Sequence, residues 1–232
     1  MKRRTLIQSS VAALALMLAG PALADAMSDA KAVVEKYATR VTTWDGPKTG
    51  PKAQEGKTIV VLAGDLKNGG ILGVTTGVEE AAAAIGWQVK VLDGAGSIGG
   101  RTAAFGQAMA LKPAGIIING FDAVEQAPAL EQAKAAGIPL VAWHAGPVIG
   151  PDEKTGLFAN VSTDAMEVSK SAADWAYADA KGKPGVVIFT DSTYAIAIAK
   201  ADKMKEEIEK LGGKVLEYVD TPLPKPPSAC RN

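Results

Sequence analysis

Residues 57–86 decide the fold class, and they read KTIVVLAGDLKNGGILGVTTGVEEAAAAIG. The first part, Thr58 to Ala63, is an unbroken β-branched and apolar run, which is typical of a strand that is buried on both faces of a sheet. A polar, glycine-rich turn follows, and Ile71 to Ile85 then has helical spacing up to Gly86, a helix-ending glycine. A buried strand followed directly by a helix is the repeating unit of a parallel α/β sheet.

The same strand-then-helix unit recurs along the chain. Further strands are predicted at Trp87–Leu92, Gly115–Asn119, Ile138–Trp143, Gly156–Val161, Val186–Thr190 and Lys214–Val219. Helices are predicted at Ile98–Leu111, Val124–Ala136, Thr163 to about Ala180, and Ile196–Leu211. This order predicts an α/β fold with a parallel, doubly wound sheet in an N-terminal lobe, residues 57–162, and an incomplete second α/β lobe, residues 163–220.

The first 24 residues have the pattern of an export signal. Residues 2–4 are Lys-Arg-Arg, residues 11–19 are apolar, and residues 22–24, Ala-Leu-Ala, give the small-x-small pattern that signal peptidase cleaves. We therefore expect cleavage after Ala24 and a soluble periplasmic product. The paired arginines leave open whether export follows the general secretory or the twin-arginine route.

Two segments flank the lobes of the mature chain. Residues 25–56 are expected to form a helix, Met27–Val41, and an extended, turn-rich strap. Residues 221–232 contain four prolines, which forbid the helix that should follow the last strand. We expect the chain to be a truncated or frame-shifted form of a longer protein, the alternative being a native proline-rich terminus.

A second lobe with only two clear strands is expected to leave apolar surface exposed, because two strands are too few to bury a sheet. The side chains expected to be partly wet are Ile188, Phe189, Leu216 and Val219.

Composition and single residues exclude several functions. Equal numbers of basic and acidic side chains, 25 of each, argue against a protein that binds nucleic acid through its phosphates. A single cysteine, Cys230, excludes an internal disulfide and a multi-cysteine metal cluster. His144 is the only histidine, and no Gly-x-Ser-x-Gly elbow is present. We expect a protein that binds and does not catalyse, with no cofactor.

Ligands of open parallel sheets bind beyond the carboxyl ends of the strands. The polar and aromatic side chains that follow the expected strands would suit a small polyhydroxylated solute. These candidates are Asp65, Lys67, Asn68, Asn119, Phe121, Asp122, Trp143, His144, Asp191 and Tyr194. Each also has a structural interpretation: Asp65 and Asp191 can cap helices, Asn119 can belong to a turn, and His144 can be a structural histidine.

One motif favours a different function. Gly94-x-Gly96-x-x-Gly99 lies between a strand and a helix and matches the dinucleotide-binding fingerprint. An exported Rossmann-type NAD(P)-dependent oxidoreductase is therefore the alternative. Against it, the motif follows the second strand instead of the first, and Asp93 places a carboxylate beside the phosphate position.

Taken in order, these segments resemble the ribose-type periplasmic sugar-binding proteins, the type I solute-binding components of ABC importers. The resemblance spans about residues 57–220 and is carried by Ile59-Val60-Val61 leading to Leu66-Lys67-Asn68, by Gly115–Asn119, by Ala136–Val141 and by Ser162-Thr163-Asp164. It implies two α/β lobes that close on a sugar or polyol, a monomer, a membrane permease as partner, and no nucleic acid.

The family's ligand contacts transfer only in part. Asn68 matches the polar residue after the first strand, but Gly70 and Ile71 stand where the family often has ring-stacking aromatics. His144-Ala145 stands where the family usually has an Asp-Arg pair. The resemblance therefore implies that Trp143, Phe121 or Tyr194 provides the stacking surface instead.

Overall fold

The computed structural model describes residues 25–44 and 46–222. The expected export signal and nearly all of the proline-rich segment lie outside these residues. The chain divides into two compact units. The six-stranded unit is formed by residues 46–165, 190–199 and 220–222, and the two-stranded unit by residues 25–44, 166–189 and 200–219.

The six-stranded unit contains a mainly parallel sheet with the strand order β2-β1-β3-β4-β6-β5. Four neighbouring pairs are parallel, and only β5 runs antiparallel, against β6. The strands are β1 (Thr58–Ala63), β2 (Gln88–Asp93), β3 (Ile116–Asn119), β4 (Leu140–Trp143), β5 (Gly150–Asp152) and β6 (Leu157–Val161). The parallel pairing that the apolar strand runs predicted is therefore confirmed.

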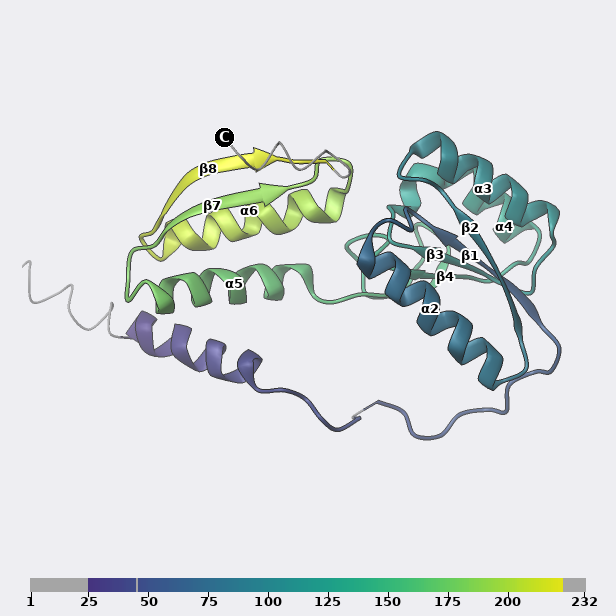
Figure 1. The fold of residues 1–232 in the computed structure, drawn as a ribbon, viewed down its shortest axis with the longest axis horizontal. Coiled ribbons are helices and arrows are strands. Elements are labelled where there is room, and N and C mark those ends of the chain that lie inside the picture. The colour runs from purple at the N-terminus through teal and green to yellow at the C-terminus, as the bar shows by residue number, and fades with distance from the viewer. Residues whose placement is uncertain (1–24, 45, 223–232) are drawn as a thin grey trace, which may run out of the picture. The chain divides into compact units, whose positions relative to one another are not determined.

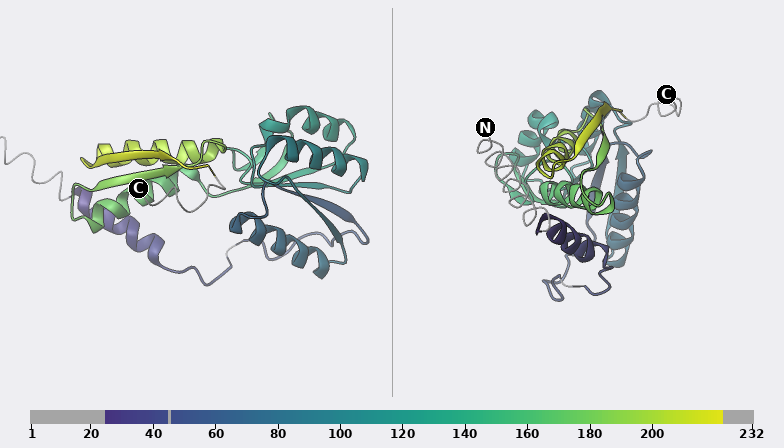
Figure 2. Two further views of the ribbon diagram at one scale, coloured as in Figure 1. Left: turned by 45° about the horizontal axis from the view of Figure 1, so that its top comes forward. Right: turned by 90° about the vertical axis from the view of Figure 1, so that its left-hand side faces the viewer.

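Helices cover both faces of this sheet. Figures 1 and 2 show α2 (Gly69–Ala84) on one face, and α3 (Ile98–Ala110) and α4 (Ala127–Ala135) on the other. The main core lies beneath α3 and α4. It is built from fully buried side chains of the central strands and of α3, including Val60, Leu62, Phe105, Ile116 and Ile118. Burial on both faces explains why β1 and β3 are apolar along their whole length.

Two elements differ from the prediction. The strand β5 was not expected, because Gly-Pro-Asp has low strand propensity, and it forms only by pairing with β6. The helix predicted over Val124–Ala136 is divided into a 3-10 turn, η1 (Ala123–Gln126), and α4. Pro128 explains the division, since proline lacks an N–H group and fits only the first turn of an α-helix.

The two-stranded unit combines three helices with one strand pair. Its elements are a helix over residues 25–38, α5 (Ala165–Asp179), β7 (Gly185–Thr190), α6 (Ala195–Lys210) and β8 (Lys214–Asp220). Figure 1 shows β7 and β8 side by side and running in the same direction. The N-terminal helix lies along α5, where Lys36 and Tyr37 both reach the Glu167 carboxylate.

One face of the β7–β8 pair is apolar and exposed. Val187, Phe189 and Leu216 are 42%, 65% and 57% exposed. Exposure of Phe189 and Leu216 agrees with the prediction, but Ile188 is buried at 4% exposure, so its predicted exposure is wrong. The reason is strand alternation: Ile188 points to the opposite face from Phe189.

Among the described residues, no helix is both long and apolar enough to cross a membrane.

Candidate functional site

The last residues of the central strands lie in register. Ala63 pairs with Asp93 of β2 and with Asn119 of β3, Asn119 pairs with Trp143 of β4, and Trp143 pairs with Val161 of β6. Because these strands are parallel and end together, the loops that follow them leave the sheet at one edge. Eight of the ten predicted site residues lie in these loops or at the strand ends that precede them, and the structure brings them to this carboxyl edge.

The loop after β1 is held by its own side chains. Asp65 is buried, and its Oδ1 accepts a hydrogen bond from the Lys67 backbone N–H at 2.9 Å. Asn68 is the N-cap of α2, and its Oδ1 accepts from the N–H groups of Gly70 at 2.9 Å and Ile71 at 3.3 Å. The capping side chain is thus Asn68, whereas Asp65 closes the turn before it. Lys67 is exposed.

Asn119, at the end of β3, faces the interior of the unit. Its side chain is fully buried, and its Nδ2 donates to the Ile71 carbonyl at 3.0 Å and to Thr75 Oγ1 at 2.9 Å. Among the described residues its Oδ1 has no hydrogen-bond partner. Asn119 therefore ties α2 to the end of β3, and its burial argues against direct contact with a solute.

The two residues that follow Asn119 are also held tightly. Gly120 has φ +77°, and a Cβ at this position would lie 2.4 Å from Ile71 Cγ1. Phe121 is fully buried, with the guanidinium of Arg101 5.5 Å from its ring centroid. Because Phe121 is fully buried and a cation already lies over its ring, Phe121 offers no free face on which a sugar could stack.

Trp143, at the end of β4, is the half-buried aromatic side chain of this edge. Its ring reaches within 3.6 Å of the position that a Gly70 Cβ would occupy and within 3.5 Å of the same position at Gly120. Its ring centroid is 4.2 Å from that of His144. His144 has φ +50°, an uncommon conformation for a residue with a side chain. Glycines beside Trp143 leave room for its large ring.

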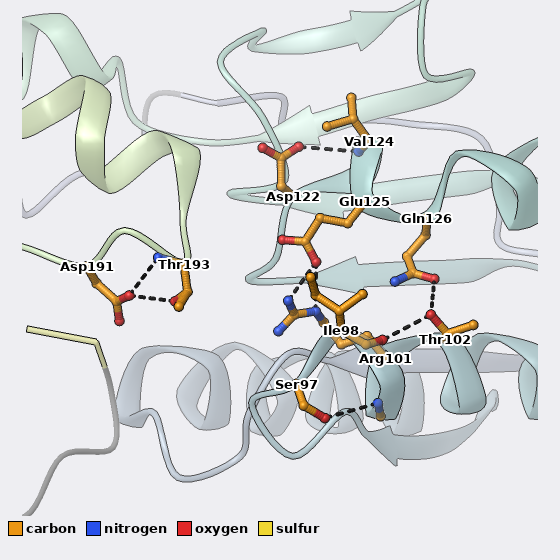
Figure 3. Close-up of polar contacts among 11 residues, drawn as sticks. Ser97, Ile98, Arg101, Thr102, Asp122, Val124, Glu125, Gln126, Asp191 and Thr193 are labelled. Atoms are coloured by element: carbon orange, nitrogen blue, oxygen red, sulfur yellow. Dashed lines mark hydrogen bonds and ion pairs between the residues drawn. The ribbon is translucent and has the colours of Figure 1, made fainter.

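Two polar side-chain pairs connect two loops of the edge, and the sequence alone did not predict them (Figure 3). Arg101 Nε and Nη2 donate to Glu125 Oε2 at 3.0 and 2.6 Å. Thr102 Oγ1 donates to Gln126 Oε1 at 3.0 Å. Each pair joins the first turn of α3 to η1. The sequence does hold a signal for the Arg101–Glu125 pair: Arg101 follows the glycine-rich loop after β2, and Glu125 follows β3, so both lie just beyond the carboxyl ends of strands.

Asp191 and Tyr194 follow β7 in the loop before α6. Asp191 Oδ1 accepts from the Thr193 N–H at 3.0 Å and from Thr193 Oγ1 at 2.5 Å, and the Asp191 carbonyl accepts from the Tyr194 N–H at 3.1 Å. Burial raises the pKa of the Tyr194 phenol above its ordinary value, so the phenol stays protonated and able to donate. Their contribution to the same site as the other eight residues stays a prediction.

Comparison with known proteins identifies the family. Residues 59–226 match a family model described as a periplasmic binding protein domain. The chain belongs to this family of periplasmic binding proteins. A search among curated protein sequences finds no match.

Solved structures agree with this periplasmic binding protein fold. A galactofuranose binding protein is 22% identical, with a TM-score of 0.63 over 71% of this chain and 56% of its own. The periplasmic component of the arabinose ABC transporter from Shewanella sp. ANA-3, bound to arabinofuranose, is 18% identical, with a TM-score of 0.62 over 71% and 55%. A solute binding protein from Agrobacterium vitis with bound allitol is 17% identical, with a TM-score of 0.62 over 74% and 58%. The chain therefore spans little more than half the length of these structures.

The glycine-rich loop of this binding protein does not form a phosphate cradle. The Ala95 N–H donates to Asp93 Oδ1 at 2.9 Å, and the Gly96 N–H donates to the Gly64 carbonyl at 2.9 Å. A Cβ on Gly96 would lie 2.8 Å from Asp65 Oδ2. A phosphate needs free N–H groups, and here they are used by the protein beside two carboxylates. The dinucleotide-binding alternative is not supported.

Two hollows of the six-stranded unit lie at the opposite edge of the sheet, where the strands begin. One, of about 470 Å³, is lined around the start of β4 and the β5–β6 turn, and the other, of about 540 Å³, around the starts of β1 and β2. Neither hollow contains a predicted site residue. We therefore place the candidate site at the carboxyl ends of the strands and not in a hollow. The described residues contain no group of three or more His, Cys, Asp or Glu side chains able to hold a metal ion.

Proposed function

We propose that this chain is an exported solute-binding component of an ABC importer and that it takes a sugar or polyol. The observation that carries the proposal is the carboxyl edge, where strands ending in register present one large aromatic ring, Trp143, beside polar groups on neighbouring loops. Membership of the periplasmic binding protein family supports it, as does the similarity to a galactofuranose binding protein and to binding proteins with bound arabinofuranose or allitol.

The chemistry of the edge suits a polyhydroxylated molecule. A tryptophan ring packs well against the C–H face of a sugar, and carboxylates accept hydrogen bonds from hydroxyl groups. Asp93 Oδ1 accepts from the Leu66 N–H in the loop after β1 and from the Ala95 N–H in its own loop, and Asp122 Oδ1 accepts from the Val124 N–H. Their second oxygens have no partner among the residues that the structure describes, and in the proposed function they meet solute hydroxyls.

The proposal includes location and partner. The basic and apolar leader supports export to the periplasm with cleavage after Ala24. A membrane permease is the partner that an importer requires. The protein acts as a monomer that binds its solute without converting it and takes no part in nucleic-acid binding.

Binding of the full chain to L-arabinose, D-galactose, D-tagatose, allitol and NAD tests the proposal. Thermal shift and ligand-observed NMR at millimolar concentration detect weak as well as tight binding. We expect at least one sugar or polyol to bind, and Trp143→Ala to weaken that binding. Trp175→Ala is the matched control, because this half-exposed ring lies on α5, a helix that carries no predicted site residue. Binding of NAD alone contradicts the proposal.

A further inference from the structure

Arg101 and Glu125 form a buried ion pair at the carboxyl edge. The Arg101 side chain is 3% exposed and the Glu125 side chain 17%. A buried guanidinium is costly unless a carboxylate pairs with it. Arg101 is further confined by Phe121 beneath it and by Gly94, where a Cβ would lie 2.4 Å from Arg101 Cγ. The position of Arg101 is therefore fixed by packing as well as by charge.

The hydrogen bonds of this pair are unevenly distributed. Both nitrogens of Arg101, Nε and Nη2, donate to the same atom, Glu125 Oε2. An arginine and a carboxylate that serve only each other commonly pair two nitrogens with two oxygens. Here Glu125 Oε1 has no hydrogen-bond partner among the described residues, and the side chain is partly open to solvent.

The loop position of Glu125 places it among the predicted site residues. It belongs to η1, which begins directly after Asp122, and the Glu125 N–H donates to the Asp122 carbonyl at 3.2 Å. Figure 3 shows the Glu125 side chain extending toward Arg101 from the loop that also carries Asp122. The neighbouring Thr102–Gln126 bond holds the same two elements together, so Glu125 does not depend on Arg101 alone for the position of its backbone.

We propose that Glu125 Oε1 accepts a hydrogen bond from a hydroxyl group of the solute, and that Arg101 is a positioning residue that holds the carboxylate in place. The inference rests on the proposed function and adds to it a contact that selects for a hydroxyl donor. A carboxylate oxygen that a bound solute covers discriminates strongly against a ligand that lacks the matching donor, because the oxygen would then be left unpaired.

Glu125→Gln tests the contact with little change of shape. The amide oxygen of glutamine takes the two bonds from Arg101, which turns its NH2 group toward the solute and replaces an acceptor with a donor. We expect the dissociation constant of the tightest-binding sugar or polyol of the panel to rise at least tenfold. Thr102→Val is the matched control, because it removes the Thr102–Gln126 hydrogen bond and leaves the Arg101–Glu125 pair in place. This exchange should change the dissociation constant less than twofold.

Two further measurements separate a contact from a structural role. The first uses analogues of the bound sugar that each lack one hydroxyl group. For one of them, the dissociation constant from the wild type should be at least tenfold higher than that of the parent sugar. For the same analogue and Glu125→Gln, the two dissociation constants should be about equal. The second compares two exchanges of Arg101. Arg101→Lys keeps the positive charge but loses the paired guanidinium N–H donors, and it should retain more affinity for the sugar than Arg101→Met, which loses both. If Glu125→Gln does not fold, Glu125→Asp replaces it, since the shorter carboxylate withdraws from the solute and should also weaken binding.

The outcomes distinguish the two proposals. Wild-type protein that binds no sugar or polyol overturns the proposed function and the Glu125 contact together. Wild-type binding with unchanged affinity in the Glu125 variant, or with no analogue that responds to it, overturns the contact alone.

Discussion

Gly120→Ala should destabilise the six-stranded unit more than any other exchange of glycine for alanine at a comparable backbone angle. With φ +77°, an L-residue at this position costs about 1–2 kcal/mol. The added Cβ would also lie 2.4 Å from Ile71 Cγ1 and 2.6 Å from Ile71 Cδ1, and such overpacking costs about 1–3 kcal/mol. The expected loss is therefore about 2–5 kcal/mol in the free energy of unfolding.

Two other glycines of the same unit serve as controls. Gly137 has φ +68° with nothing within 4 Å of its would-be Cβ, so Gly137→Ala should cost only the backbone strain, about 1–2 kcal/mol. Gly73 lies inside α2 with nothing within 4 Å, and Gly73→Ala should stabilise by about 0.5–1 kcal/mol. Urea unfolding followed by tryptophan fluorescence measures all three. Equal losses for Gly120→Ala and Gly137→Ala would refute the steric part of the reasoning.

Three further predictions concern other contacts. Asn68→Ala should lower the free energy of unfolding by about 1 kcal/mol through loss of the α2 cap, whereas Asn68→Asp should not, as urea melts of both variants will show. Ile188→Ala should cost about 2–5 kcal/mol and Phe189→Ser less than about 0.5 kcal/mol, because only the first is buried; equal losses in chemical unfolding would contradict the assignment of strand faces. A hydrogen bond from Lys203 lowers the pKa of the Glu207 carboxyl, so this pair stabilises α6 above the ordinary glutamate pKa and its contribution is lost as the pH falls through the lowered value. The protection factors of α6 amides, which correct for the slower intrinsic exchange in acid, should therefore fall with falling pH in wild type and depend less on pH in Glu207→Gln.

The sequence predicts the fold well where local pattern and tertiary role agree. A fully apolar strand such as Thr58–Ala63 is stable only when helices cover both faces of its sheet. The same run therefore predicts a strand, a parallel sheet around it and helices on both sides. The strand β5 could not be predicted in this way, because nothing in Gly150–Asp152 favours a strand apart from its partner. The division at Pro128 could have been anticipated, since the residue sits where no helix interior can accept it.

The sequence predicts which residues follow the strands at the carboxyl edge, but it does not predict which of their side chains face outward. That depends on packing: Asn119 and Phe121 are buried, whereas Trp143 is half-buried. Arg101 and Glu125 are 24 residues apart, and no local pattern links residues at that separation. Their pairing depends on β2 and β3 lying on either side of β1, which is a property of the sheet order and not of either segment.

The N-terminal helix has a consequence for the order in which the chain folds. Its partner, α5, is contacted through Lys36 and Glu167, which are 131 residues apart, and Ala30 is buried at 1% exposure. Closing a flexible loop of that length costs about 4 kcal/mol beyond a constant. All six strands of the larger sheet lie between these two helices, so their collapse draws the two ends of the loop together. A chain that emerges N-terminus first therefore presents the helix over residues 25–38 long before α5, the partner that this helix contacts.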